Sequence, residues 1–449
     1  MIRTVISVIV ACPRLWPFQP YGPSDSLAPW LVSPGHKIEN PDMMRGNRTF
    51  KKIDRWAGIP MLLAAAAMRK TIRAATHAGP KGTDGHKIRS GDRILIIKQS
   101  ALGDTLLLLP ILKALHGSVG SSGQVDMLVT PVNSIIAENS PWLDDILLFD
   151  PSRLSRHPRH LPGLIRKIRS RRYTVVLDFD QWLRSSALLA AVSGGATTAG
   201  FRTPGQHRHF AYDLTVTQTE KRHEYCLFKD LASSCGLPAG TVEPFTGFLA
   251  ENNLFESTAP DTQDRTNGMR VLFHPGCGSH GWQREWPSAN YARLGSALSS
   301  SYDISIMISG HGDHEIPLAR KIIEKGDFNS IDLSGRLTFP QLVAAVKNAD
   351  LVVCGNTGIM HLAAGYGTPL VALHGPTDHL KWGPDYSCGK VSETQDPGPA
   401  VIIPADIPCS PCLFLGYEYG CSGRACMESI QVETVLAACS KILDKGQTL

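Results

Sequence analysis

The stretch Asp350–Gly375, DLVVCGNTGIMHLAAGYGTPLVALHG, predicts one complete strand–turn–helix–strand unit. The apolar run DLVV favours a buried strand, and the turn Asn-Thr-Gly precedes a helix of small residues, IMHLAAGYG. Thr357 is placed to cap that helix, which leaves the helix amide groups from Gly358 onwards at an open end that attracts anions. His361 lies one turn further on the same face, so its ring either faces that ligand or packs in the core.

The same alternation recurs on both sides of this stretch. The runs RILIIK, VDMLVT, DDILLFD and YTVVLDF follow a charged, Gly-rich linker that ends near Asp92. A second series begins at RVLFHPG, after the polar linker ENNLFESTAPDTQDRTNGM. Apolar runs separated by helix-length segments are typical of parallel α/β units. We therefore expect an α/β fold with an N-terminal extension, 1–90, and two Rossmann-like domains, 91–255 and 256–449.

Composition narrows the class of function. The chain has 449 residues, 43% of them hydrophobic, and its net charge of +5 does not indicate a nucleic-acid binder. Its 11 cysteines are too few for a disulfide scaffold. The N-terminal run TVISVIVAC lacks an A-x-A-like cleavage site, so we expect a disordered extension or an upstream start codon, and reduced cytosolic thiols.

Two further segments each allow a functional and a structural interpretation. The apolar stretch Trp56–Met68 is shorter than the ~20 residues of a spanning helix. It is either a membrane-surface helix or a helix packed on the main body. The basic stretch Arg153–Arg172 either attracts lipid headgroups and anionic saccharides or is a solvated helix.

Ligands of open α/β sheets bind beyond the carboxyl ends of the strands, so the loops there are candidate sites. The loop in IIKQSALGDTLLLLP places Asp104 at a helix N-terminus. Its carboxylate is either a general base or a plain N-cap. The loop in LFHPGCGSHGWQREWP places several glycines before Arg284, which suits phosphate binding but also a flexible turn. In a fourth loop, SGHGDHE, Asp313 or Glu315 either binds a ribose hydroxyl or is solvated.

Together these motifs resemble glycosyltransferase family 9, the lipopolysaccharide heptosyltransferase family. The resemblance runs from Arg93 to about Val435, through ILIIKQSALGDTLLLLPILKAL, RRYTVVLDFDQWLRSSALLA, HPGCGSHGWQREWP and DLVVCGNTGIMHLAAGYGTPLVALHGPTDHLKWGP. It implies a GT-B fold, in which an N-terminal acceptor domain and a C-terminal donor domain face each other across a cleft. It also implies inverting, metal-independent transfer from a nucleotide-sugar, usually ADP-heptose, to a lipid-linked core saccharide, with no cofactor.

The resemblance assigns roles residue by residue. Asp104 matches the general base, Arg284 a basic residue that binds the donor phosphates, and Thr357, Gly358 and His361 the donor-phosphate loop. The donor-binding candidates are His274, Gly276, Gly278, Arg284, Asn356, Thr357, Gly358 and His361, and the acceptor-side candidates are Ser100, Gly103 and Thr105.

One departure concerns the donor. The family often has Asp directly before Thr-Gly, whereas this chain has Asn356, which removes a charge beside a diphosphate. Three interpretations therefore stay open: a heptosyltransferase at the cytoplasmic membrane face, a family 9 enzyme with another nucleotide-sugar or acceptor, and a non-catalytic sugar-nucleotide-binding protein.

Four cysteines form a C-x2-C-x8-C-x4-C pattern that suits either a structural zinc or a surface loop of free or disulfide-prone thiols. They are Cys409, Cys412, Cys421 and Cys426. No catalytic metal is expected.

Overall fold

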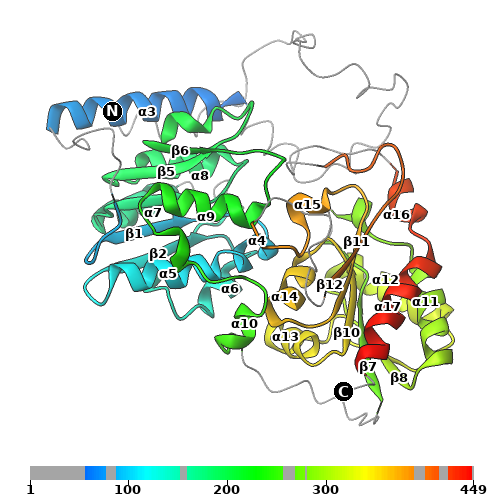
Figure 1. Ribbon diagram of the computed structural model, residues 1–449. Coiled ribbons are helices and arrows are strands. Elements are labelled where there is room, and N and C mark those ends of the chain that lie inside the picture. The colour runs from blue at the N-terminus through cyan, green and yellow to red at the C-terminus, as the bar shows by residue number, and fades with distance from the viewer. Residues whose placement is uncertain are drawn as a thin grey trace, which may run out of the picture.

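The computed structural model describes residues 56–76, 87–151, 159–255, 268–278, 281–388, 400–413 and 423–446. Two lobes lie side by side, each built around a six-stranded sheet (Figure 1). The strands of the first sheet are β1 Arg93–Ile97, β2 Gln124–Val129, β3 Asp145–Leu148, β4 Val175–Asp178, β5 Thr197–Arg202 and β6 Leu214–Thr217. Those of the second are β7 Met269–His274, β8 Ile304–Ile308, β9 Ser330–Asp332, β10 Leu351–Gly355, β11 Leu370–His374 and β12 Ala400–Pro404.

Both sheets have the same doubly wound topology. Their strand orders are β3-β2-β1-β4-β5-β6 and β12-β11-β10-β7-β8-β9, and every pair is parallel. The strand order reverses between β1 and β4 in one sheet and between β7 and β10 in the other. Such reversals open a crevice at the carboxyl ends of the strands. The predicted α/β class is confirmed, and the loops after these four strands are where a ligand is expected.

Helices cover the faces of each sheet. In the first lobe they are α4 Leu102–Leu106, α5 Leu109–Val119, α6 Ser134–Glu138, α7 His160–Ser170, α8 Arg184–Val192, η3 Arg208–Ala211, α9 Glu224–Ser234, η4 Ala239–Thr241 and α10 Phe248–Glu251. In the second they are η5 Trp282–Arg284, α11 Ser288–Ser301, α12 Gly312–Lys325, α13 Phe339–Lys347, α14 Gly358–Tyr366, α15 His379–Trp382, α16 Ala425–Ser429 and α17 Val432–Gly446.

The segment after β1 is a broken helix. Two helices, α4 and α5, follow one another here, because Pro110 in the first turn of α5 lacks the amide that would continue α4. Within the described residues Leu102–Val119 is long and apolar enough to cross a membrane, but 67% of it is buried inside the protein. That burial is typical of a core helix.

The apolar helix α3, Gly58–Thr76, packs on the first lobe, so the structural interpretation of this segment is confirmed (Figure 1). Leu62 and Ala65 are buried against α8 and η3, and Arg69 Nη2 lies 2.6 Å from Asp213 Oδ2. Apolar side chains remain exposed near the start of the helix, since Leu63 of α3 is 45% exposed and Trp56, two residues before α3, is 72% exposed. Membrane contact through these side chains stays a prediction.

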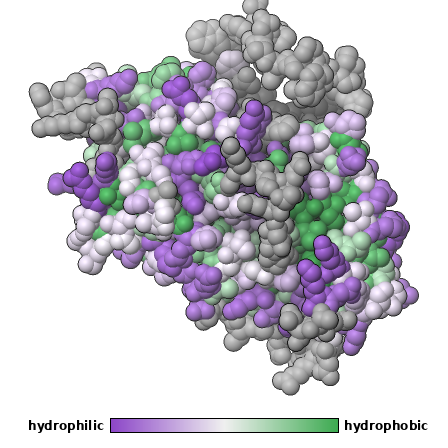
Figure 2. Space-filling model, viewed as in Figure 1, coloured by the Kyte–Doolittle hydropathy of each residue, from purple (hydrophilic) through white to green (hydrophobic). Residues whose placement is uncertain are grey.

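Apolar residues also join the lobes. One continuous core includes Leu249 and Phe245 of the first lobe and Ala364 of α14 in the second. The Gly247 amide donates to the Ala364 carbonyl oxygen at 3.2 Å. Figure 2 shows a largely polar surface on which hydrophobic residues gather most visibly over the second lobe, near its edge strand β12.

Candidate active site

The loop after β1 lies directly against the start of α14. A Cβ atom added to Gly103 would stand 2.7 Å from His361 Cδ2, closer than real Cβ contacts allow, and a tight 3.2 Å from Gly358 Cα. Only glycine permits this approach. The contact brings together the predicted base loop of one lobe and the predicted donor-phosphate loop of the other.

Asp104 lies in α4 with one carboxylate oxygen fixed. Its Oδ2 accepts a hydrogen bond from Lys98 Nζ at 3.1 Å, and its side chain is 19% exposed. Among the described residues no hydrogen-bond partner is found for its Oδ1. Ala101, three residues before Asp104, has φ 64°, a left-handed value that is unfavourable for a residue other than glycine. One oxygen of the carboxylate is thus held while the other can accept a proton.

Asp180, which follows β4, organises the rest of this loop. Its carboxylate accepts the Gln99 amide at 2.6 Å and the Ser100 hydroxyl at 3.0 Å, and it lies 3.7 Å from Lys98 Nζ. Burial lowers the pKa of Lys98, but the carboxylates of Asp104, Asp180 and Glu224 outweigh burial and raise it overall. Lys98 is therefore a buried cation shared between carboxylates.

The three acceptor-side candidates are placed differently. Gly103 lies at the contact between the lobes, and the Ser100 hydroxyl is bound to Asp180. Thr105 is buried, donates its hydroxyl to the Ala101 carbonyl at 2.8 Å and accepts the Asn133 amide at 2.9 Å. The structure therefore brings Gly103 and Ser100 to the site, while Thr105 is turned into the core.

Asn356 and Arg284 meet at the open end of α14. Thr357 occupies the N-cap position, yet its side chain makes no capping hydrogen bond, which corrects the expected cap. Arg284 Nη1 donates to the Asn356 carbonyl at 2.7 Å and to its Oδ1 at 3.3 Å, and Nη2 donates to the Cys277 carbonyl at 3.0 Å. These acceptors are all neutral, and no carboxylate pairs with Arg284 in the described part of the chain. A half-buried cation beside a helix N-terminus is an electrostatic site for an anion.

The side chain of Asn356 acts as donor and acceptor at once. Its Oδ1 accepts from Arg284, and its Nδ2 donates to the Trp382 carbonyl at 3.3 Å. An aspartate cannot donate to that carbonyl, so the amide matches its surroundings.

Glu315 fixes the glycine-rich loop. Its carboxylate accepts the Gly278 amide and the His311 amide, each at 2.8 Å. A Cβ atom on Gly276 would lie 2.4 Å from Glu315 Cδ, so glycine is required there. Both oxygens of Glu315 are occupied in this way, which gives it a supporting role in place of the ribose contact considered above.

The two histidines of the predicted donor site are buried and held by hydroxyl groups. His274 Nδ1 lies 2.9 Å from Ser309 Oγ, and His361 Nδ1 lies 2.7 Å from the Tyr386 hydroxyl. Burial lowers the pKa of His361 to about 4, although Asp104 opposes the shift. Burial likewise lowers the pKa of His274 against the effect of Glu315. At neutral pH both rings are uncharged and can only donate or accept hydrogen bonds.

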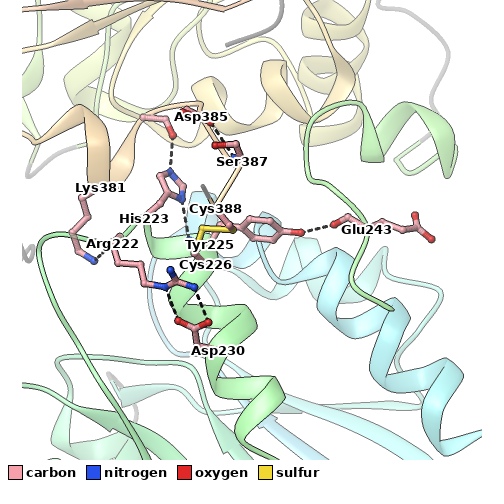
Figure 3. The surroundings of a disulfide bond; sticks show 11 residues. Arg222, His223, Tyr225, Cys226, Asp230, Glu243, Lys381, Asp385, Ser387 and Cys388 are labelled. Carbon is pink, nitrogen blue, oxygen red and sulfur yellow. Dashed lines mark hydrogen bonds and ion pairs between the residues drawn. A yellow bond between two sulfur atoms is a disulfide. The ribbon is translucent and has the colours of Figure 1, made fainter. Parts of the chain in front are cut away.

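The first residues of α9, together with His223 just before it, pack against the segment of the second lobe that runs from Lys381 to Cys388 (Figure 3). Residues His223–Cys226 contact residues 381–388 of the other lobe. The contacts are His223 Nε2 to the Gly383 carbonyl at 2.9 Å, Glu224 Oε2 to Lys381 Nζ at 2.9 Å, the Tyr225 and Tyr386 rings at 6.0 Å between centroids, and a Cys226–Cys388 disulfide. The expectation of reduced thiols is therefore wrong for this pair of cysteines.

The four-cysteine pattern and the basic stretch show no ligand site among the residues that the structure describes. Cys409 is exposed, Cys412 half-buried and Cys426 buried, while Cys421 lies outside the described residues, so the zinc prediction stays a prediction. Within the described ranges no group of three or more His, Cys, Asp or Glu side chains is arranged to hold a metal. Arg171 at the end of the basic stretch is structural, because its guanidinium pairs with Asp126 and Asp145.

Sequence reasoning missed Lys98, Asp180, Tyr386 and the pair Glu224–Lys381. Lys98 and Asp180 had a signal, since each follows a strand at the switch point of the first sheet. Tyr386 and Lys381 had none, because their roles depend on how the two lobes dock.

Comparison with known proteins identifies relatives. A family model described as glycosyltransferase family 9 (heptosyltransferase) matches residues 162–394, just over half of the chain. Lipooligosaccharide heptosyltransferase 2 of Campylobacter jejuni is 25% identical over 181 residues, which cover 39% of this chain and 52% of the relative. Lipopolysaccharide heptosyltransferase 3 of Escherichia coli is 30% identical over 101 residues, which cover 22% of this chain and 29% of the relative. The chain thus spans about half the length, or less, of these curated relatives.

Solved structures share the architecture. A family 9 glycosyltransferase from Veillonella parvula superposes with a TM-score of 0.62 at 18% identity, covering 80% of this chain and 100% of that one. The Escherichia coli heptosyltransferase WaaC with ADP superposes with a TM-score of 0.59 at 18% identity, covering 78% of this chain and 99% of that one. Identities this low establish the fold alone, and the predicted GT-B class is confirmed.

Proposed function

The chain belongs to glycosyltransferase family 9, and from that premise we propose that it moves a sugar, heptose being the first candidate, from a nucleotide-sugar such as ADP-heptose to a lipopolysaccharide-core or lipid A-linked acceptor. The contact of Gly103 with Gly358 and His361 carries the proposal. It brings a carboxylate, Asp104, to the open end of a helix where a diphosphate is favoured. A base and an anion site at one point of contact are what direct glycosyl transfer requires.

Asp104 is the proposed general base. Its Oδ1 accepts the proton of the acceptor hydroxyl, while Oδ2 stays bound to Lys98. The hydroxyl oxygen attacks the anomeric carbon from the side opposite the diphosphate, the bond from that carbon to the diphosphate breaks, and the configuration inverts. The position of Asp104 across from α14 supports this order of groups.

The leaving diphosphate is stabilised by the protein itself in this proposal. Arg284 and the first amides of α14 lie where negative charge grows as the glycosidic bond breaks, so their effect is larger in the transition state than in the ground state. The present partners of Arg284 are neutral carbonyl and amide oxygens, which a phosphate can outcompete. No metal is needed in this scheme.

The donor is proposed on the strength of relatives. A structure similar in fold was solved with ADP, and another with an ADP-heptose analogue. Asn356 stands where the family often has aspartate, so a second proposal is that the donor is another nucleotide-sugar, whose sugar is transferred by the same residues.

We also propose that the enzyme works at the cytoplasmic face of the inner membrane. The exposed apolar side chains of Leu63 in α3 and of Trp56 just before it suit contact with a lipid surface. Co-sedimentation with anionic vesicles tests this placement, and the matched variant is Trp56→Ser with Leu63→Ser. Equal sedimentation of the variant and the parent contradicts it.

The proposed activity is tested by offering the purified protein a panel of nucleotide-sugars with a lipid-linked core acceptor and measuring sugar transfer. Transfer from one donor, with inversion at the anomeric carbon, supports the proposal. Binding of a nucleotide-sugar without transfer across the whole panel instead supports a non-catalytic binding protein.

Arg284→Ala checks the phosphate site. Loss of charge-assisted hydrogen bonds worth about 1.5–3 kcal/mol weakens binding of the donor and of the nucleoside diphosphate roughly 10- to 100-fold. Affinity for the nucleoside alone should stay unchanged. Arg293→Ala, which removes an exposed arginine on α11, is the matched control. Equal diphosphate affinity in Arg284→Ala and in the control rules out this phosphate role.

A further inference from the structure

We propose that Lys98 is a positioning residue that aims the carboxylate of Asp104 and keeps it ionised, and that Asp180 limits this effect by competing for the same ammonium group. The proposal rests on the proposed role of Asp104 as general base. It adds a device that sets the pH range in which the base works.

The geometry gives Lys98 two carboxylate partners. Its Nζ lies 3.1 Å from Asp104 Oδ2 and 3.7 Å from Asp180 Oδ1, and its side chain is only 3% exposed. An ammonium group at that distance in a dry surrounding attracts the charged form of a carboxylate. Asp180 is 1% exposed and stays fixed by the Gln99 amide and the Ser100 hydroxyl, so it cannot move away from the lysine.

The surroundings of Asp104 leave Lys98 as its direct cationic partner in the described residues. Glu224 on α9 acts on Lys98 and Asp104 through space, and it is itself paired with Lys381 at 2.9 Å. His361 on α14 faces Asp104 but has a pKa of about 4 because it is buried, so it is neutral in the working range. Lys98, which lies between the carboxylates of Asp104 and Asp180, is therefore the positive charge in direct contact with the proposed base.

Lys98 also fixes the direction of the carboxylate. It binds Oδ2, so the opposite oxygen, Oδ1, faces away from the lysine and is available to the acceptor hydroxyl. Without the lysine the carboxylate can turn and take a proton at higher pH. Both effects reduce turnover without touching the donor site at Arg284.

The two partners of Lys98 give a test with opposite signs. Lys98→Met removes the cation, so the acidic limb of the kcat profile moves to higher pH by about one unit, and kcat falls while KM for the donor stays the same. Asp180→Asn keeps the hydrogen-bond acceptor for the Gln99 amide but removes the competing charge, so the acidic limb moves to lower pH. If Lys98 and Asp180 act only in folding, the acidic limb stays in place in both variants or moves in the same direction in both. Either result overturns the proposal.

A control variant, a fallback and a variant of the base itself make each outcome interpretable. Lys321→Met, an exposed lysine on α12, should leave the profile unchanged. If Lys98→Met does not fold, Asp180→Asn decides alone, because an upward shift or no shift contradicts the proposal. Asp104→Asn separates the two levels: full activity in that variant refutes Asp104 as the base, whereas lost activity with unshifted profiles in the other variants refutes only the role of Lys98.

Discussion

Lys381 Nζ lies 2.9 Å from Glu224 Oε2, and this ion pair joins the two lobes with both side chains essentially inaccessible to solvent. The lysine also donates to the Thr219 and Arg222 carbonyls. Since all three partners belong to the first lobe and Lys381 belongs to the second, the pair fixes how the lobes meet beside Asp104 and α14.

Breaking this pair should destabilise the protein strongly. Lys381→Met leaves Glu224 charged and buried, and such a loss costs about 3–5 kcal/mol of unfolding free energy. The matched change, Arg293→Met, breaks an exposed pair with Glu433 and costs less than about 1 kcal/mol. Urea unfolding of both variants measures the difference, and equal costs would show that the pair does not hold the lobes together.

The disulfide between Cys226 and Cys388 should add stability that a reductant removes. It closes a loop with a sequence separation of 162 residues, and a disulfide typically contributes about 2–4 kcal/mol. A dithiol reductant therefore lowers the melting temperature of the parent protein but not that of the variant with both cysteines changed to alanine. The same shift in both proteins would mean that the disulfide contributes nothing to stability.

Asn356→Asp should weaken donor binding even though aspartate is common at this position in the family. The new carboxylate cannot donate to the Trp382 carbonyl, and it places negative charge beside the proposed diphosphate. We expect roughly tenfold weaker binding of the nucleotide-sugar, or about 1.4 kcal/mol. Calorimetric titration measures it, with nucleoside as the uncharged reference ligand. Unchanged or tighter donor binding contradicts the bridging role of the amide.

Acidification should destabilise the fold through buried histidines. Burial lowers the pKa of His223 and of His361 to about 4, from an ordinary value of 6.5. Because the unfolded chain takes up protons that the folded chain cannot, stability is full above pH 6.5 and is lost as the pH falls towards 4. Urea unfolding at pH 7 and pH 5 tests this, and His223→Gln should make the decline smaller. A free energy of unfolding that is unchanged or larger at pH 5 contradicts this account.

The pattern of apolar residues along the sequence predicted much of the fold. The strands β1 and β10 are continuous apolar runs, which is the signature of strands buried on both faces, and their following turns could be located from the sequence. The strands β5 and β6 were not predicted from the sequence. The segment TTAGFR has few large apolar residues, and LTVT, at the sheet edge, alternates between half-buried and exposed positions.

The candidate site was only partly accessible to sequence reasoning. Asp104, Arg284 and the start of α14 each follow a strand, so each could be proposed within its own lobe. That the two domains face each other came only from the family resemblance, and the contact of Gly103 with His361 could not be read from local pattern because it forms only once the two lobes have docked. The same holds for Cys226 and Cys388, where composition favoured free thiols and long-range geometry placed the two sulfur atoms together.

The most direct test of the central claim compares Asp104→Asn with the parent protein in sugar transfer and in donor binding. The amide keeps the size of the side chain but cannot take the proton of the acceptor hydroxyl, so kcat should fall by about 10²–10⁴-fold. Donor affinity and the melting temperature should stay close to those of the parent. Asp406→Asn, which changes an exposed aspartate, is the control. Transfer at the parental rate by Asp104→Asn would contradict the claim that Asp104 is the base.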